Sequence, residues 1–200
     1  LVEKGQAQWQ VPVASLFADM TTHPAWAEAT IEELLSHTAG LRDADVIGLD
    51  WLLTARADPA SLAEQRRVLA QKALAGPPPG PPGQFAYGNI NYIVVGAAIE
   101  AITGQSWEEA MRAEVYGPLG LESGGFGPPS PDGDPAAQPW GHTAVVDRLV
   151  PQNPLDSGSD NPLALGPAGT AHMSIDDYAR FVGVFLNDGA GWLKPETIRH

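Results

Sequence analysis

The apolar positions along the chain fall into helical patterns that glycine and proline interrupt. Residues Ile31 to Thr38 follow a capping threonine, carry a glutamate three residues after that cap, and stop at Gly40. Residues Trp51 to Leu74 place leucine and valine among alanine and charged residues, which is the pattern of an amphipathic helix, and Ser61 with Glu64 forms a second capping box within them. We therefore expect a short capped helix and then a longer amphipathic helix in this part of the chain.

The most apolar segment of the chain runs from Asn89 to Thr103. Its side chains are apolar almost all round, as in a helix that is buried on most faces, and Gly104 is placed to end it. Ser106 and Glu109 then form a capping box for a further helix, which we expect to extend through Val115. The segment 89–103 is therefore the predicted central helix of the core.

Proline, glycine and one apolar stretch predict the remaining elements. The run Gly76 to Gly83 is too rich in proline for a helix or a central strand, so it is a stiff connector. Gly124 to Pro139 is typical of a surface loop, and Val145 to Val150 is the best candidate for a strand. Ser174 begins a last capped helix that ends before Gly189. We expect many helices and few strands.

The charge and composition of the chain exclude several classes of function. The formal net charge is −13 at pH 7 and the pI is about 4.5, which opposes binding to nucleic acid because phosphate contacts need clustered Lys and Arg. There are no cysteines, so disulfides and thiolate metal sites are excluded. No apolar run reaches the roughly 18 residues of a membrane span. We expect a globular chain without a nucleic-acid partner or a membrane span.

Tyr87 and Asn89 are the candidate site residues with the most informative surroundings. A rigid Pro81-Pro82-Gly83 turn precedes them and the predicted buried helix begins at Asn89, so both side chains can face one cleft. The simpler alternative is a buried tyrosine and a helix-capping asparagine without a chemical role. The pattern Tyr-x-Asn alone favours that alternative, and only the surrounding segments reverse it.

Several segments around Tyr87 and Asn89 match one family in the same order. They are Leu1-Val2-Glu3-Lys4-Gly5 with Trp9 and Pro12, Leu34-Leu35-Ser36-His37-Thr38-Ala39-Gly40-Leu41, Gly117-Pro118-Leu119-Gly120-Leu121, Pro167-Ala168-Gly169, and Asp177-Tyr178-Ala179-Arg180-Phe181. The chain thereby resembles the serine β-lactamase family, which includes class C β-lactamases, penicillin-binding proteins, D-alanyl-D-alanine carboxypeptidases and related esterases. The second motif of this family is Tyr-x-Asn after a Pro-Pro-Gly turn. The resemblance covers nearly the whole chain.

The resemblance implies an α+β fold of the β-lactamase/transpeptidase type, of which this chain is mostly the helical lobe with few strands. It implies a serine hydrolase that cleaves a β-lactam, a D-alanyl peptide or an ester through an acyl-enzyme. By resemblance Tyr87 is the catalytic proton-transfer residue and Asn89 binds the substrate, with no metal or organic cofactor. The implied partner is a small-molecule or peptide substrate, and the implied location is periplasmic or extracellular because family members are often exported.

The chain departs from the family pattern at the nucleophile. In the family the serine of a Ser-x-x-Lys motif attacks the carbonyl, but Leu1, Leu69 and Gly191 stand three residues before the three lysines here. The third family motif, on an edge strand, is expected beyond the last helix. Leu1 to Gly5 resemble the end of a helix that begins earlier. We therefore expect residues 1–200 to be part of a single domain, truncated at both ends and inactive alone.

Two alternatives to a serine hydrolase remain open on the sequence. The first is a catalytically inactive β-lactamase-like binding module that keeps the cleft and has lost the nucleophile. The second is a helical interaction domain, for which the matching segments would be coincidental. This second alternative predicts that Tyr87 is buried and that its hydroxyl is bonded internally.

Other polar residues have simpler structural interpretations. His37 is a conceivable general base, but a histidine late in a short helix usually packs and interacts with the last carbonyls. His142 and His172 lie far apart, without the three or four converging ligands of a metal site. Six aspartates lack the regular spacing of a calcium loop. We expect them to form a solvated acidic face: Asp43, Asp45, Asp50, Asp58, Asp156 and Asp160.

Overall fold

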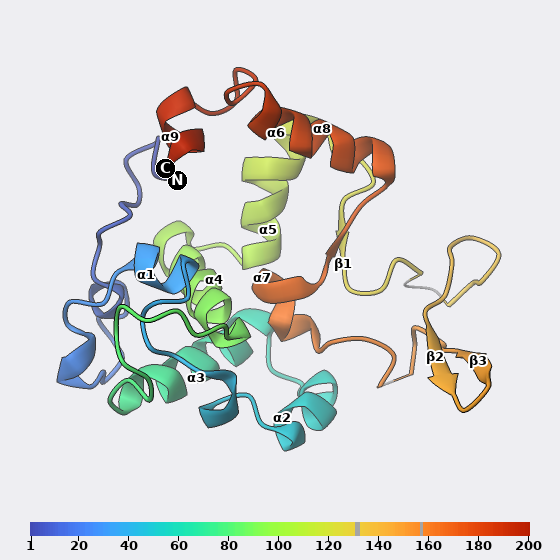
Figure 1. Cartoon of the computed structure of the whole chain (residues 1–200), viewed down its shortest axis with the longest axis horizontal. Coiled ribbons are helices and arrows are strands. Elements are labelled where there is room, and N and C mark those ends of the chain that lie inside the picture. Colours follow the sequence, from blue (N-terminus) through green and yellow to red (C-terminus); the bar gives the residue numbers. More distant parts are fainter. Residues whose placement is uncertain (131–132, 157) are drawn as a thin grey trace.

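The computed structural model describes residues 1–130, 133–156 and 158–200, and it is mainly helical (Figure 1). The α-helices are α1 (Ile31–Leu35), α2 (Leu49–Thr54), α3 (Leu62–Ala75), α4 (Asn89–Thr103), α5 (Trp107–Met111), α6 (Gly117–Leu119), α7 (Gly166–Gly169), α8 (Ile175–Leu186) and α9 (Pro195–Arg199). The strands are β1 (Gly125–Phe126), β2 (His142–Val145), β3 (Arg148–Pro151) and β4 (Ala171–His172). Short 3₁₀ segments cover Val13–Leu16, Pro24–Trp26, Asp43–Asp45, Ala55–Ala57 and Leu163–Leu165, and a π-helical turn covers Arg112–Tyr116. The predicted α+β chain with few strands is confirmed.

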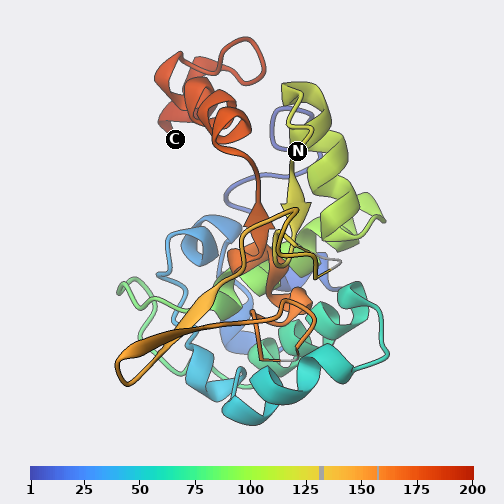
Figure 2. The same ribbon diagram turned by 90° about the vertical axis from the view of Figure 1, so that its right-hand side faces the viewer.

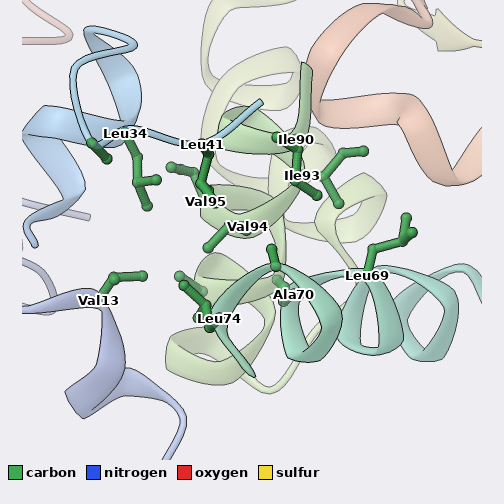
Figure 3. Close-up of a cluster of buried hydrophobic side chains, with 14 of the residues drawn as sticks. Val13, Leu34, Leu41, Leu69, Ala70, Leu74, Ile90, Ile93, Val94 and Val95 are labelled. Carbon is green, nitrogen blue, oxygen red and sulfur yellow. The ribbon is translucent and has the colours of Figure 1, made fainter. Parts of the chain in front are cut away.

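Helix α4 lies at the centre of the hydrophobic core. Residues Ile93 to Ala98 are all buried, and α1, α3 and α7 pack against the helix. Figure 3 shows Val94 of α4 facing Leu74 of α3, with Leu34 of α1 beside them. Burying one such aliphatic side chain stabilises a fold by about 1.5–3 kcal/mol. The predicted buried helix is therefore confirmed, and Gly104 ends it with a φ of 69°.

A buried ion triad joins three of these helices. Arg66 of α3 has no exposed side-chain surface, and its Nη2 donates to Glu100 Oε1 of α4 at 2.6 Å and to Glu108 Oε2 of α5 at 2.8 Å. Burial opposes the charged guanidinium, but the hydrogen bonds to Glu108 and Glu100 outweigh it and raise the pKa of Arg66. A buried charge is tolerated only when it is paired in this way. The triad therefore fixes how α3, α4 and α5 pack.

Two predicted helices end or break earlier than expected. Helix α1 ends at Leu35 and not at Thr38, because His37 adopts a left-handed backbone with a φ of 58°. The expected helix over 51–74 is interrupted, since α2 and α3 are separate helices, and Ser61 caps the start of α3 by accepting from the Glu64 N–H at 3.2 Å. Pro59 stands between them, and it lacks a backbone N–H and restricts the residue before it.

The strands also differ from the predictions. The expected strand Val145 to Val150 is wrong because β2 and β3 form an antiparallel hairpin that turns within this range. Val146 lies in that turn with a φ of 53° and is 93% exposed. The hairpin extends away from the helical body (Figures 1 and 2). Part of the predicted 124–139 loop is strand β1, which pairs with β4; residues 131–132 of that loop lie outside the described residues.

A second group of helices lies away from the core. The capping box of Ser106 and Glu109 forms as predicted, and α5 leads through a π-helical turn to α6 and towards α8 (Figure 1). The first and last segments of the chain meet there, since Glu3 Oε1 accepts a hydrogen bond from the Lys194 N–H at 2.6 Å and Lys4 pairs with Glu114 of the π-helical turn. Among the described residues, no helix has both the length and the apolar character needed to cross a membrane.

Candidate active site

The proline-rich connector from Gly76 to Gly83 leads to the candidate residues, and it runs beside the segment that follows α1. Gly40 has a φ of 89°, and a Cβ there would collide with the Gly80 carbonyl, so the close approach of the two segments requires glycine. Backbone N–H groups of the connector and of Ala86 after it donate to carbonyl oxygens of the segment that follows α1. Gly80 donates to Gly40 at 2.9 Å, Gly83 to Thr38 at 2.8 Å, and Ala86 to His37 at 2.9 Å. The proline-rich connector is therefore held along its length by hydrogen bonds as well as by its prolines.

The structure brings Tyr87 and Asn89 together at the start of α4. The Tyr87 hydroxyl donates to Asn89 Oδ1 at 3.0 Å. Asn89 is the first residue of the helix and is partly buried, whereas Tyr87 is 65% exposed. The helical interaction domain predicted a buried Tyr87, which is wrong, and an internally bonded hydroxyl, which the bond to Asn89 confirms. The exposed phenol stays accessible to a ligand while its hydroxyl is held in one direction.

Asp43 is a third member of this group, so the prediction that it lies on a solvated acidic face is wrong. Its Oδ2 accepts a hydrogen bond from Asn89 Nδ2 and its Oδ1 accepts one from the backbone N–H of Ile90, both at 2.8 Å. Gly88 precedes α4 and has no side chain with which to cap it, so the Asp43 carboxylate caps the helix from a distant segment. The missing local cap at Gly88 indicates that another group must satisfy the start of α4, but it does not indicate which segment supplies that group.

His37 supports the backbone around Tyr87. Its ring centroid lies 4.8 Å from that of Tyr87 and 5.2 Å from that of Tyr92, and the Phe85 ring meets its edge. Its Nδ1 accepts a hydrogen bond from the Gly88 N–H at 3.4 Å. The ring packs against aromatic side chains, as predicted, but its hydrogen bond is to the Gly88 N–H, in place of the predicted contact with the last carbonyls of α1.

His142 and His172 lie on strands β2 and β4. His142 is exposed on β2, and His172 of β4 hydrogen-bonds through Nδ1 to the Gly127 carbonyl at 2.7 Å. Within the described ranges, no group of three or more His, Asp or Glu side chains is arranged to hold a metal ion. The site residues brought together are therefore a phenol, a carboxamide and a carboxylate, of which the phenol can transfer a proton and the carboxamide can bind an amide or ester carbonyl.

Comparison with known proteins identifies relatives of this chain. The sequence is 28% identical over 200 residues to penicillin-binding protein 4 of Amycolatopsis lactamdurans, covering 94% of this chain and 47% of that protein. It is 28% identical over 197 residues to an unguisins hydrolase of Aspergillus campestris, covering 95% of this chain and 34% of that protein. The chain thus spans less than half the length of these relatives.

The fold agrees with the sequence comparison. The structure of an octameric penicillin-binding protein homologue from Pyrococcus abyssi superimposes with a TM-score of 0.70 at 24% identity, covering 100% of this chain and 44% of that one. At this identity the likeness establishes the transpeptidase-like fold. The family model named Beta-lactamase matches residues 1–199. The chain therefore belongs to the β-lactamase family.

Proposed function

We propose that this chain carries the Tyr-x-Asn portion of the active site of a serine hydrolase that cleaves an amide or ester through an acyl-enzyme. Residues 1–200 are then part of a single, longer β-lactamase-like domain, which agrees with the share of 34% and 47% that the chain spans of its relatives. The nucleophilic serine of a Ser-x-x-Lys motif belongs to a part of the protein outside these residues. The relatives, named as a penicillin-binding protein and a hydrolase, support a hydrolytic role.

The observation that carries the proposal is the hydrogen bond between the exposed Tyr87 and the helix-anchored Asn89. A serine hydroxyl is a weak nucleophile until a neighbouring group takes its proton, and the leaving nitrogen or oxygen needs a proton when its bond to carbon breaks. Tyr87 is the group proposed to transfer that proton. Asn89 is proposed to bind the substrate amide beside the reacting carbonyl.

The substrate class follows from the same chemistry. A β-lactam, a D-alanyl peptide and a simple ester each present a carbonyl for attack and a neighbouring group that an asparagine amide can bind. The acyl-enzyme forms when the serine oxygen bonds to the carbonyl carbon and the leaving group departs with a proton. Water then attacks the acyl carbon and releases the serine.

The test is covalent labelling with a fluorescent penicillin and a fluorescent fluorophosphonate. The complete protein encoded by the source gene is compared with the 200-residue chain, and labelling is expected in the complete protein alone. Tyr87→Phe in the complete protein is expected to slow labelling by roughly 10²- to 10⁴-fold, the usual contribution of proton transfer by a positioned side chain. Tyr178→Phe, on another exposed tyrosine, is the matched control and should label at the unaltered rate.

A catalytically inactive binding module is the second candidate. It predicts that the Ser-x-x-Lys motif, which these 200 residues lack, is absent from the rest of the protein as well. If neither the complete protein nor the chain is labelled, while the complete protein binds the penicillin reversibly, the hydrolase proposal is wrong and the binding module replaces it.

A further inference from the structure

Asp43 uses both oxygens of its carboxylate at the start of α4. One accepts from the backbone N–H of Ile90 and the other from Asn89 Nδ2. Gly88 leaves room for this approach, because a Cβ at that position would make tight contacts, 3.3 Å from Asp43 Oδ1 and 3.4 Å from the Asp43 nitrogen. The segment after α1 is held against the connector independently of this carboxylate, by the backbone hydrogen bonds of residues 37–40. Asp43 therefore binds both the backbone at the start of α4 and one particular side chain, that of Asn89.

The charge of Asp43 determines which way the Asn89 amide faces. An ionised carboxylate can only accept hydrogen bonds, so the nitrogen of the amide must point towards it. The oxygen of the amide must then point the other way, which is where the Tyr87 hydroxyl donates to it at 3.0 Å. A carbonyl oxygen can only accept, so the Tyr87 hydroxyl is the donor in this contact. Asp43, Asn89 and Tyr87 thus form a row of two hydrogen bonds: Tyr87 donates to Asn89, and Asn89 donates to Asp43.

We propose that Asp43 is a positioning residue of the active site, which acts through Asn89 and fixes the hydrogen-bonding direction of the Asn89 amide and of the Tyr87 hydroxyl. This inference rests on the proposed function. It also assigns the two Nδ2 hydrogens of Asn89: one is held by Asp43, and the other is left for the carbonyl oxygen of the substrate. A flipped amide would present its oxygen to that carbonyl, and two acceptors repel.

The proposal predicts the effect of making position 43 neutral while keeping its shape. In Asp43→Asn one of the two acceptor oxygens becomes a donor, which favours a flipped Asn89 amide. We expect acylation of the complete protein to slow by roughly 10- to 100-fold, since misplacing one group in a site has effects of this order. Asp45→Asn is the matched control, because Asp45 lies exposed in the same short turn, and it should leave the rate unchanged.

A double-mutant cycle separates positioning from simple loss of structure. If Asp43 acts through Asn89, Asp43→Asn should have no further effect on the acylation rate in an Asn89→Ala background. An equal loss in both backgrounds would show that Asp43 only supports the fold and would overturn the inference. The melting temperature of each variant is measured alongside the rates.

Nuclear magnetic resonance of the unaltered complete protein tests the same contact without activity or mutation. A scalar coupling across the hydrogen bond between Asn89 Nδ2 and the Asp43 carboxyl carbon is expected. Coupling of Asn89 Nδ2 to another acceptor, or none to Asp43, would overturn the inference even if the protein is a hydrolase. Conversely, a protein that no probe acylates but that shows this coupling would refute the proposed function and keep the orientation.

Discussion

Helices α4 and α8 are both long and rich in apolar residues, but the fold uses them in opposite ways. The 15-residue α4 is enclosed by α1, α3 and α7, and most of its side chains are buried. The 12-residue α8 buries Val184 but leaves Ile175 77% exposed and Leu186 79% exposed. Apolar content therefore does not by itself decide burial, because burial depends on which elements pack around the helix.

The attachment of α8 is mainly polar at its start. The buried Asp177 accepts hydrogen bonds at Oδ2 from the backbone N–H and the hydroxyl of Ser123, and at Oδ1 from Arg180. The Ser174 N–H donates back to the Ser123 hydroxyl. The hydrogen bonds from Ser123 lower the pKa of Asp177, and the nearby Arg180 adds to this. Helix α4 is thus held by apolar packing, whereas the start of α8 is held by a set of directed hydrogen bonds.

The largest expected effect on stability comes from shortening a buried side chain of α4. Ile93 is fully buried, so Ile93→Ala leaves a cavity and should lower the free energy of unfolding by about 2–5 kcal/mol. Urea unfolding followed by circular dichroism measures it. Ile93→Val, which removes less, should cost about 0.5–1.5 kcal/mol. A loss below that of the valine variant would mean that α4 is not enclosed as described.

An intermediate effect on stability is expected from Asp177→Asn, which removes the charged group that accepts the hydrogen bonds from Ser123 at the start of α8. The pKa of Asp177 is lower in the folded protein than its value of 3.8 in the unfolded chain. Ionised Asp177 therefore stabilises the fold at any pH above 3.8, and this stabilisation is lost as the pH falls through the folded pKa. The variant should therefore be less stable than the unaltered protein at pH 7, and the difference should vanish in strong acid. Unfolding measured from pH 7 down to pH 2 provides the test.

The exposed neighbour Asp176 offers the control for this experiment. Asp176→Asn keeps the first turn of α8 and changes the same chemical group without touching Ser123. Its effect on stability should be small at every pH. Equal losses for the two variants would attribute the effect to the charge near the helix start and not to the hydrogen bonds of Asp177.

The smallest expected effect is that of Leu186→Ala on α8. A side chain that is 79% exposed makes few contacts to lose, so the free energy of unfolding should change by no more than about 0.5 kcal/mol. The comparison with Ile93→Ala is direct, because both changes remove an aliphatic side chain from a long helix. A loss of the size expected for Ile93→Ala would show that α8 is covered in the protein measured.

Much of the local structure could be predicted from the sequence, because its causes lie within a few residues. The apolar run and terminal glycine of 89–103 predict α4, and the hydroxyls of Ser106 and Ser174 cap the helices that they precede. Tyr87 and Asn89 are two residues apart at a helix start, so their proximity follows from the motif itself. Their chemical roles stay predictions.

Features that depend on distant partners could not be predicted in this way. The sequence by itself determined which segments form α4 and α8, and that Tyr87 and Asn89 stand together. Only the tertiary structure decided that α4 is enclosed while α8 is exposed, and that Asp43, 46 residues before Asn89, holds its amide. The physical reason is that a capping carboxylate or a buried face needs a partner in space, and no periodicity or spacing along the chain specifies which segment supplies it.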